Sequence, residues 1–279
     1  MSAMLAPTGR GQQPDNVTPV RRARSVCGPR IVFTYMTYAS VNGLQLYYEV
    51  HGSGRPIVLL HGGLLTIDLT FGSLLKPLAA NRQVIAVELQ GHGHTADTER
   101  PMTIEALASD VIALLDQLEI AEADLFGFSL GGLVSYAIAL SAPSRVGKMI
   151  VASADGHRPP GRESVPLDDE SMPPPSAFQE MRNAYTAVAP DPAHFEEFAA
   201  KNSKMVHETP GWTDELRSLR TPTLLIFGDR DFSPLSDIVE LFGLLPNAQL
   251  AVLPGTTHIG VTQRPDEVLA LITPFLGGD

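Results

Sequence analysis

The sequence holds a single cysteine, Cys27, among 279 residues. One thiol cannot form an internal disulfide or supply the several thiolates of a cysteine-based zinc site. No run approaches the roughly 20 apolar residues that a membrane-spanning helix needs. Basic residues are also scarce, because 20 lysines and arginines stand against 31 aspartates and glutamates, for a net charge of −11. This balance repels phosphate backbones, so we expect no nucleic-acid partner and no membrane partner.

Apolar residues, by contrast, make up 44% of the chain, enough to bury one large core. Residues 1–35 differ from the rest, since they carry five arginines, one acid and four prolines without an apolar period. This composition predicts a disordered N-terminal arm. The arm has no apolar region typical of a secretion signal, so we expect a cytoplasmic protein, with a transit peptide as the alternative.

From residue 38 onward, strand-like and helix-like segments alternate. Residues 38–50 predict a hairpin, because Asn42-Gly43 is a preferred two-residue turn. Helical periodicity with Thr103 as N-cap predicts a helix to residue 118. Further helices are expected at 132–142, 236–244 and 265–275, and buried strands at 57–60, 83–89, 124–128, 148–153, 223–227 and 249–253. The alternation predicts an α/β fold with a mostly parallel sheet and helices on both faces.

One segment interrupts this alternation. Residues 156–219 show no strand pattern, and helices are expected at 176–188 and 193–206. We interpret 156–219 as a helical cap, or lid, inserted into a core made of residues 36–155 and 220–279. A surface helix pair without function is the alternative.

The strongest chemical signal is Gly127-Phe128-Ser129-Leu130-Gly131, which follows an apolar strand and opens a helix. A nucleophile on such a sharp turn needs glycine two positions to either side, because side chains there would collide. The pattern therefore predicts Ser129 as a nucleophile that projects from a strand end.

A serine hydroxyl needs a base to remove its proton and an acid to orient that base. Asp231 and His258 each follow a later predicted strand, in the chain order serine, acid, histidine. We therefore predict Asp231 as the acid and His258 as the base. Asp229, which we expect to fix the turn, and Asp155 are the alternative acids.

Stabilisation of an oxyanion needs two N–H donors. The N–H of Leu130 is one candidate, and Gly63 in His61-Gly62-Gly63 is the other, since glycine lets the backbone approach a substrate closely. His61 itself is expected to stabilise the loop.

With these motifs, residues 38–279 resemble the α/β-hydrolase family of serine hydrolases. The resemblance rests on His61-Gly62-Gly63, the turn Gln90-Gly91-His92-Gly93, the serine elbow, Gly228-Asp229-Arg230-Asp231 and His258. It implies the same roles for Ser129, Asp231, His258, Gly63 and Leu130, hydrolysis without metal or cofactor, and a cap at 156–219. Glu88 departs from the family, which usually has aspartate before this turn, and it is expected to change how the turn is braced.

The substrate is less defined. The segment from Glu88 to Asp97 also resembles serine-dependent macrolide esterases and cassette-borne esterases. The expected cap offers an apolar set that would bind a small-molecule substrate: Phe178, Met181, Tyr185, Phe198, Met205 and Trp212. Acids at 168–170, 196 and 197 would form either an acidic rim for a cationic group or a solvated face. The hypothesis is cleavage of a carboxylic ester through an acyl-enzyme, with ring opening of a macrocyclic lactone as the narrower reading.

Other functions remain open at this point. The same triad would support short-chain carboxylesterase, peroxide-dependent or carbon–carbon bond chemistry, or a non-catalytic receptor for a small ligand. A metal site on His92, His94 and Asp97 does not match the spacing of metallohydrolases. The glycines at 62–63 do not match a dinucleotide-binding loop. Serine at position 129 argues against epoxide hydrolases and dehalogenases, which use aspartate.

Overall fold

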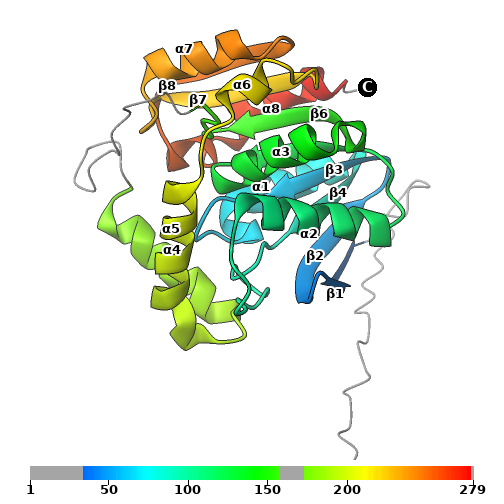
Figure 1. Ribbon diagram of the computed structural model, residues 1–279, viewed down its shortest axis with the longest axis vertical. Helices are drawn as coiled ribbons and strands as arrows, with labels where there is room; N and C mark the ends of the chain where they lie inside the picture. Colours follow the sequence, from blue (N-terminus) through cyan, green and yellow to red (C-terminus); the bar gives the residue numbers. More distant parts are fainter. Residues whose placement is uncertain (1–33, 158–172, 278–279) are drawn as a thin grey trace, which may run out of the picture.

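The computed structural model describes residues 34–157 and 173–277, which build an eight-stranded sheet flanked by helices (Figure 1). The strands lie in the order β1-β2-β4-β3-β5-β6-β7-β8. Strands β1 and β2 are antiparallel to their neighbours, and all later pairings are parallel. The strand bounds are β1 Thr34–Val41, β2 Leu44–Gly52, β3 Arg55–Leu60, β4 Arg82–Val87, β5 Ala123–Phe128, β6 Val146–Ala152, β7 Thr223–Arg230 and β8 Ala248–Thr257. The predicted α/β fold is confirmed.

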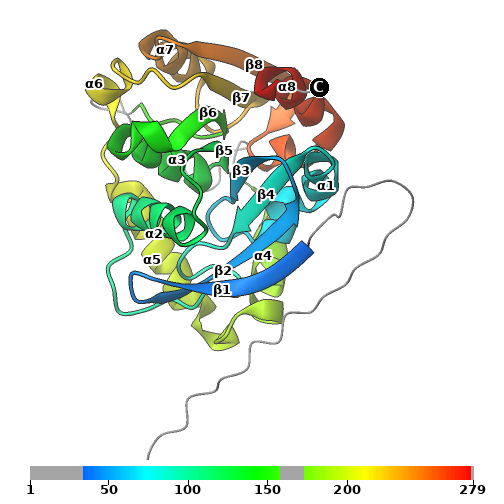
Figure 2. The same ribbon diagram turned by 90° about the vertical axis from the view of Figure 1, so that its right-hand side faces the viewer.

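Helices cover both faces of this sheet, with α1 and α8 on one side and α2 and α3 on the other (Figure 2). Their bounds are α1 Ile67–Ala79, α2 Ile104–Gln117, α3 Leu130–Ser141, α4 Pro175–Val188, α5 Phe195–Glu208, α6 Thr213–Leu216, α7 Leu235–Leu244 and α8 Pro265–Leu276. Single 3-10 turns lie at Pro143–Arg145, Pro192–His194 and Ile259–Val261. Within the described residues, no helix is long and apolar enough to cross a membrane.

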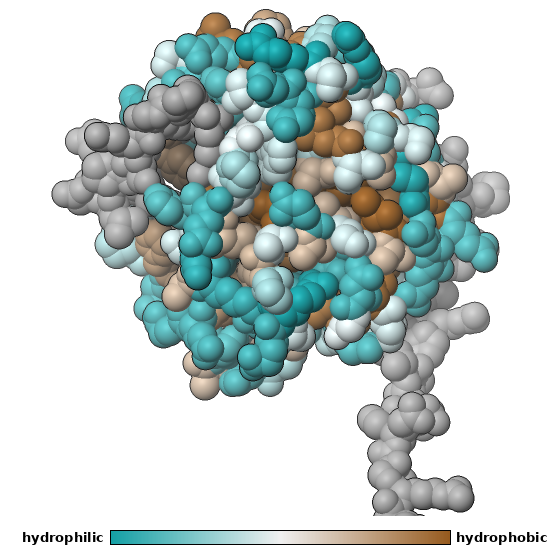
Figure 3. All heavy atoms as spheres, in the orientation of Figure 1, coloured by the Kyte–Doolittle hydropathy of each residue, from teal (hydrophilic) through white to brown (hydrophobic). Residues whose placement is uncertain are grey.

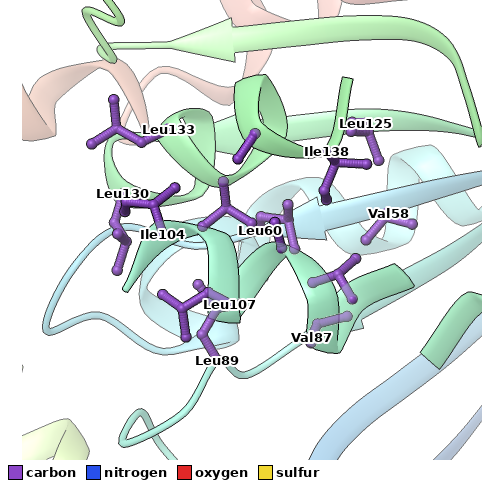
Figure 4. Packing of buried hydrophobic residues seen from close by; sticks show 14 of the residues in the cluster. Val58, Leu60, Val87, Leu89, Ile104, Leu107, Leu125, Leu130, Leu133 and Ile138 are labelled. Carbon is purple, nitrogen blue, oxygen red and sulfur yellow. The ribbon is translucent and has the colours of Figure 1, made fainter. Parts of the chain in front are cut away.

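Successive side chains of the buried strands point to opposite faces of the sheet, so the hydrophobic core consists of two clusters, one on each face. On β3, Ile57 and Leu59 pack with α1 and α8, whereas Val58 and Leu60 pack with α2 and α3. All four side chains are inaccessible to solvent. Figure 4 shows the cluster that contains Val58 and Leu60, in which Leu60 lies among side chains of α2 and α3. Burial of each such side chain contributes about 1.5–3 kcal/mol, so the sheet is anchored from both faces.

Local sequence signals account for several element boundaries. Asn42 and Gly43 have φ values of 47° and 84°, as a tight hairpin turn requires, so the predicted hairpin is confirmed. The Thr103 side chain accepts a hydrogen bond from the N–H of Ala106 at 3.1 Å and caps α2 as predicted. Helix α1 was not predicted, because Gly72 and Pro77 weaken its helical pattern.

The expected arm was two residues too long. Thr34 and Tyr35 belong to β1, where they pair with β2, and the ring of Tyr35 meets that of Tyr48 edge-on at 6.1 Å. Residues 1–33 lie outside the described residues.

Helices α4 and α5 form between β6 and β7, where the sequence predicted two helices. They lie together at one end of the molecule, beyond the sheet and next to the chain that follows β4 (Figure 1). The outer surface of this part is largely hydrophilic in Figure 3, as expected for helices that turn their apolar side inward. Residues 158–172 of the expected cap, with the acids at 168–170, lie outside the described residues.

Candidate active site

Ser129 occupies the sharp turn between β5 and α3, with φ 51° and ψ −115°. A Cβ atom at Gly127 would overlap the carbonyl oxygen of Gly131, and one at Gly131 would overlap the carbonyl oxygen of Leu60. Both flanking positions therefore require glycine, for the steric reason that the sequence suggested. Such a backbone costs about 1–3 kcal/mol and is held here by its surroundings, including the 2.8 Å bond from the N–H of Ser129 to the carbonyl of Ala152.

His258 joins Ser129 to Asp231. Its Nε2 lies 3.0 Å from the Oγ of Ser129, and its Nδ1 lies 2.9 Å from Oδ1 of Asp231. An ionised carboxylate only accepts, so Nδ1–H donates to Asp231 and Nε2 is left to accept from the serine hydroxyl. His258 and Asp231 are buried, whereas Ser129 is partly exposed. The three predicted residues thus form a connected chain that ends at an accessible hydroxyl.

Electrostatics favour the charged form of Asp231. Burial raises the pKa of this carboxyl group, but the charge of His258 and its hydrogen bond outweigh burial, so the pKa is lowered from 3.8.

Two aromatic rings contact the imidazole of His258. Phe232 stacks on His258 with centroids 3.8 Å apart, and Phe128 lies at 5.2 Å. Sequence reasoning missed both rings, although each is next to a predicted site residue.

The alternative acids have other partners. Asp229 is exposed and accepts a hydrogen bond from the N–H of Thr256 at 3.1 Å, which ties β7 to β8. Asp155 accepts from the N–H of His157 at 2.9 Å. Neither carboxylate contacts His258, so the geometry favours Asp231.

The two predicted oxyanion donors lie on adjoining segments. Leu130 opens α3, where an N–H has no intrahelical partner. Gly131 donates to the carbonyl of His61 at 3.0 Å and so joins the elbow to the loop that holds Gly63. His61 is buried, and its two ring nitrogens lie 2.8 Å from the carbonyl oxygen of Gly62 and 3.1 Å from the N–H of Leu89. Its side chain therefore braces the loop, as expected.

Glu88 braces the following turn in a way that the sequence did not reveal. Its carboxylate accepts from the backbone N–H of His94 at 2.6 Å and contacts Nδ1 of the same residue at 2.8 Å. This hydrogen bond raises the pKa of His94 above 6.5, against a smaller opposing effect of burial. His92 instead contacts the carbonyl oxygen of Gln90 at 3.0 Å. Nowhere in 34–157 or 173–277 do three His, Cys, Asp or Glu side chains gather as a metal site requires.

The six predicted substrate-binding residues do not form one cluster. Tyr185, Phe198 and Met205 pack into the core cluster of α2 and α3, and the rings of Tyr185 and Phe198 stack at 5.4 Å. Met181 packs into the cluster on the other face. Trp212 is partly exposed beside Tyr136, at 6.4 Å. Phe178 is 41% exposed and lies outside both clusters. Packing of the cap on the core thus accounts for at least four of these residues.

Two relatives show how far the similarity extends. A non-heme haloperoxidase of Rhodococcus erythropolis is 28% identical over 275 residues, covering 84% of this chain and 97% of that protein. The dihydrolipoyllysine-residue acetyltransferase component of an acetoin cleaving system of Pseudomonas putida is 43% identical over 120 residues. That alignment covers 42% of this chain, which spans about a third (32%) of the longer relative.

A solved structure shares the fold. The enol-lactonase from Burkholderia xenovorans LB400 superposes with a TM-score of 0.71 at 22% identity, covering 86% of this chain and 99% of that one. The family model described as alpha/beta hydrolase family matches residues 57–271, which include the elbow, both later site residues and the helices between β6 and β7. The chain therefore belongs to the alpha/beta hydrolase family.

Proposed function

We propose that the protein is a serine hydrolase that cleaves carboxylic esters through an acyl-enzyme. One observation carries the proposal: the Nε2 of His258 lies 3.0 Å from the Ser129 hydroxyl, while its Nδ1 lies 2.9 Å from Asp231. This is the hydrogen-bond distance that proton transfer from a nucleophile to its base requires.

In the proposed reaction, Ser129 Oγ attacks the ester carbonyl carbon as its proton passes to Nε2 of His258. The N–H groups of Gly63 and Leu130 stabilise the oxyanion. The tetrahedral intermediate expels the alcohol, which takes the proton from His258. Water then attacks the acyl-enzyme with His258 as base, which releases the carboxylic acid and restores Ser129.

For the substrate, we propose a lactone or simple ester, and a macrocyclic lactone as the narrower candidate. The resemblance of the segment from Glu88 to Asp97 to macrolide esterases supports the macrocycle, whereas at least four of the six apolar residues pack in the core clusters. The acids of α5 do not support a cationic group on the substrate, because both already have basic partners in the protein. Glu196 pairs with Arg182, and Glu197 lies 3.3 Å from His194. These acids form part of the solvated face of the cap.

The test is incubation with a panel of short-chain aryl esters, simple lactones and macrolides, followed by mass spectrometry. Ring opening adds the mass of one water, and Ser129→Ala serves as the control for background hydrolysis. Turnover of aryl esters with every macrolide returned intact would refute the macrocycle and leave the esterase. A protein that cleaves no ester and is not labelled at Ser129 by a fluorophosphonate would refute the proposed function.

A second candidate is peroxide-dependent chemistry, which the similarity to a non-heme haloperoxidase favours. Hydrogen peroxide in place of water would attack the acyl-enzyme and give its proton to His258, which passes it to the departing oxygen of Ser129 as the peracid is released. Bromide oxidation in acetate buffer, measured with and without peroxide, tests this reaction. Dependence on both acetate and Ser129 would support it.

A further inference from the structure

One polar residue of the cap faces the loop that carries a proposed oxyanion donor. The buried positions of α5 are Phe195, Phe198, Asn202 and Met205, a helical stripe that is apolar except for Asn202. Asn202 is only 6% exposed. An apolar side chain would be expected at this place on an amphipathic helix, so the carboxamide needs an explanation.

The carboxamide of Asn202 packs against Gly63. A Cβ atom at Gly63 would stand 2.9 Å from Nδ2, 3.3 Å from Oδ1 and 3.5 Å from Cγ of Asn202. The missing side chain of Gly63 therefore gives room to the carboxamide, in addition to letting a substrate approach. Gly63, Leu64 and Ser129 are all partly exposed, so a ligand that reaches Ser129 along this loop would lie beside the contact.

The oxygen of this carboxamide has no protein partner. Oδ1 of Asn202 is buried and accepts no hydrogen bond within the part of the chain that the structure describes. A buried acceptor without a donor is unfavourable, because it has lost its hydrogen bonds to water without replacement. A substrate that brings a donor to Oδ1 would recover this free energy on binding.

The helix that carries Asn202 is held in place. The neighbouring Lys201 reaches the core loop, where its Nζ lies 2.7 Å from Oδ1 of Asp97 and 2.7 Å from the carbonyl oxygen of Thr98. These contacts hold α5 against the core, so the carboxamide of Asn202 has a fixed position.

Resting on the esterase function proposed above, we propose that Asn202 is a specificity residue that selects the acyl part of the substrate. When the scissile carbonyl oxygen accepts a hydrogen bond from the N–H of Gly63, the carboxamide of Asn202, which packs against the same glycine, lies beside the atoms next to the carbonyl carbon. Its unpartnered oxygen then accepts a hydrogen bond from a donor on those atoms. The favoured substrates are therefore esters or lactones with a hydroxyl or amide N–H on the carbon next to the scissile carbonyl.

The experiment compares esters that differ only in this donor. Methyl 2-hydroxybutanoate is matched with methyl 2-methoxybutanoate, which has a similar inductive effect and no donor. Methyl 2-acetamidobutanoate is likewise matched with its N-methyl analogue, so that the two pairs separate hydroxyl from amide recognition. The measured quantity is the ratio of kcat/KM within each pair, which cancels general losses of activity. In the wild-type protein, the ratio should favour the donor by about tenfold in at least one pair.

Three variants locate the effect. Asn202→Ala removes the acceptor, and the ratio should fall to about one. Asn202→Asp keeps an acceptor of the same shape, so the ratio should persist even if both rates fall. Asn183→Ala removes an exposed asparagine of α4 and should leave the ratio and both rates unchanged. A wild-type ratio near one in both pairs, or an unchanged ratio in Asn202→Ala, would overturn the proposal.

A binding measurement distinguishes failure of the esterase function from failure of the role proposed for Asn202. If no methyl ester is hydrolysed, calorimetry on the Ser129→Ala protein gives the Kd of each ester with Asn202 present and replaced by alanine. Tighter binding of the donor-bearing ester by about tenfold, lost in Asn202→Ala, would uphold the role of Asn202. Equal Kd values would overturn it. Thermal melts of every variant identify those that are merely unfolded.

Discussion

Lys201 on cap helix α5 is joined to Asp97 in the core loop after β4, with its Nζ 2.7 Å and 3.0 Å from the two carboxylate oxygens. The Asp97 side chain is 5% exposed and that of Lys201 is 28% exposed. Burial raises the pKa of Asp97, but the hydrogen bonds from Lys201 and Gln90 outweigh burial and lower it. This ion pair joins α5 to the loop that follows β4.

Loss of this pair should therefore loosen the cap. We expect Lys201→Met to lower the free energy of unfolding by about 1.5–3 kcal/mol, because a largely buried carboxylate loses its charged donor. The matched control is Lys204→Met on the same helix, where the exposed pair with Glu208 spans 4.0 Å. That change should cost less than about 0.5 kcal/mol. Urea unfolding of both variants checks the prediction, and equal losses would contradict it.

Replacement of the nucleophile is the direct test of catalysis. Ser129→Ala should lower kcat by several orders of magnitude and leave the melting temperature close to that of the wild type, since only one hydroxyl is removed. Initial rates on a short-chain aryl ester provide the measurement. Retention of more than a few per cent of the activity would rule out Ser129 as nucleophile.

The three candidate acids should separate clearly by kinetics. Asp231→Asn leaves the shape of the site intact but removes the charge that orients His258, so kcat should fall by roughly 10⁴-fold. Asp229→Asn and Asp155→Asn should change kcat far less, because neither side chain contacts His258. Rates of the three variants, with folding checked by thermal melts, decide the order. A larger loss in either control variant would move the acid to another strand.

The contact between His94 and Glu88 should make stability depend on pH. The pKa of His94 is raised above its ordinary value of 6.5 in the folded protein. Protonation therefore stabilises the fold, and this contribution is complete below about pH 6.5 and lost as pH rises through the raised pKa. The gap in unfolding free energy between the wild type and His94→Gln should be wider at pH 5.5 than at pH 9.

Denaturant titrations at both pH values give the free energies. A gap for His94→Gln that stays constant, or one that widens at pH 9, would show that the imidazole is not stabilised as the cation.

Much of the fold follows from local sequence signals. Three features each depend on residues within a few positions of one another: the turn at Asn42-Gly43, the N-cap of α2 at Thr103 and the apolar run that becomes β3. Helix α1 was missed for the same reason, because Gly72 and Pro77 weaken its local pattern while burial of Phe71 and Leu74 in the core stabilises it. Both glycines of the elbow were predicted from the motif, although only the steric demand at Gly127 is local, because a Cβ atom at Gly131 would overlap Leu60 of β3.

The two acids at the end of β7 lie two positions apart. In a regular strand, positions 229 and 231 face the same side, so strand periodicity alone does not separate Asp231, predicted as the acid, from its alternative Asp229. The pairing of β7 with β8 is irregular between Gly228 and Arg230, which leaves Asp229 on Thr256 and Asp231 against His258. The order serine, acid, histidine predicted the three positions, and the register of this strand pair brings Asp231, rather than Asp229, within hydrogen-bond distance of His258.

The contacts that the cap makes were still further from what the sequence could reveal. The helix at 193–206 was predicted, but not its contacts, because Asn202 and Gly63, like Lys201 and Asp97, are separated by more than a hundred positions along the chain. By itself the sequence determined most of the helices and strands and the residues at their ends, because these depend on neighbours within a turn or a strand. The tertiary structure alone decided which polar groups of α5 meet those of the core, because the two sets come from segments far apart along the chain.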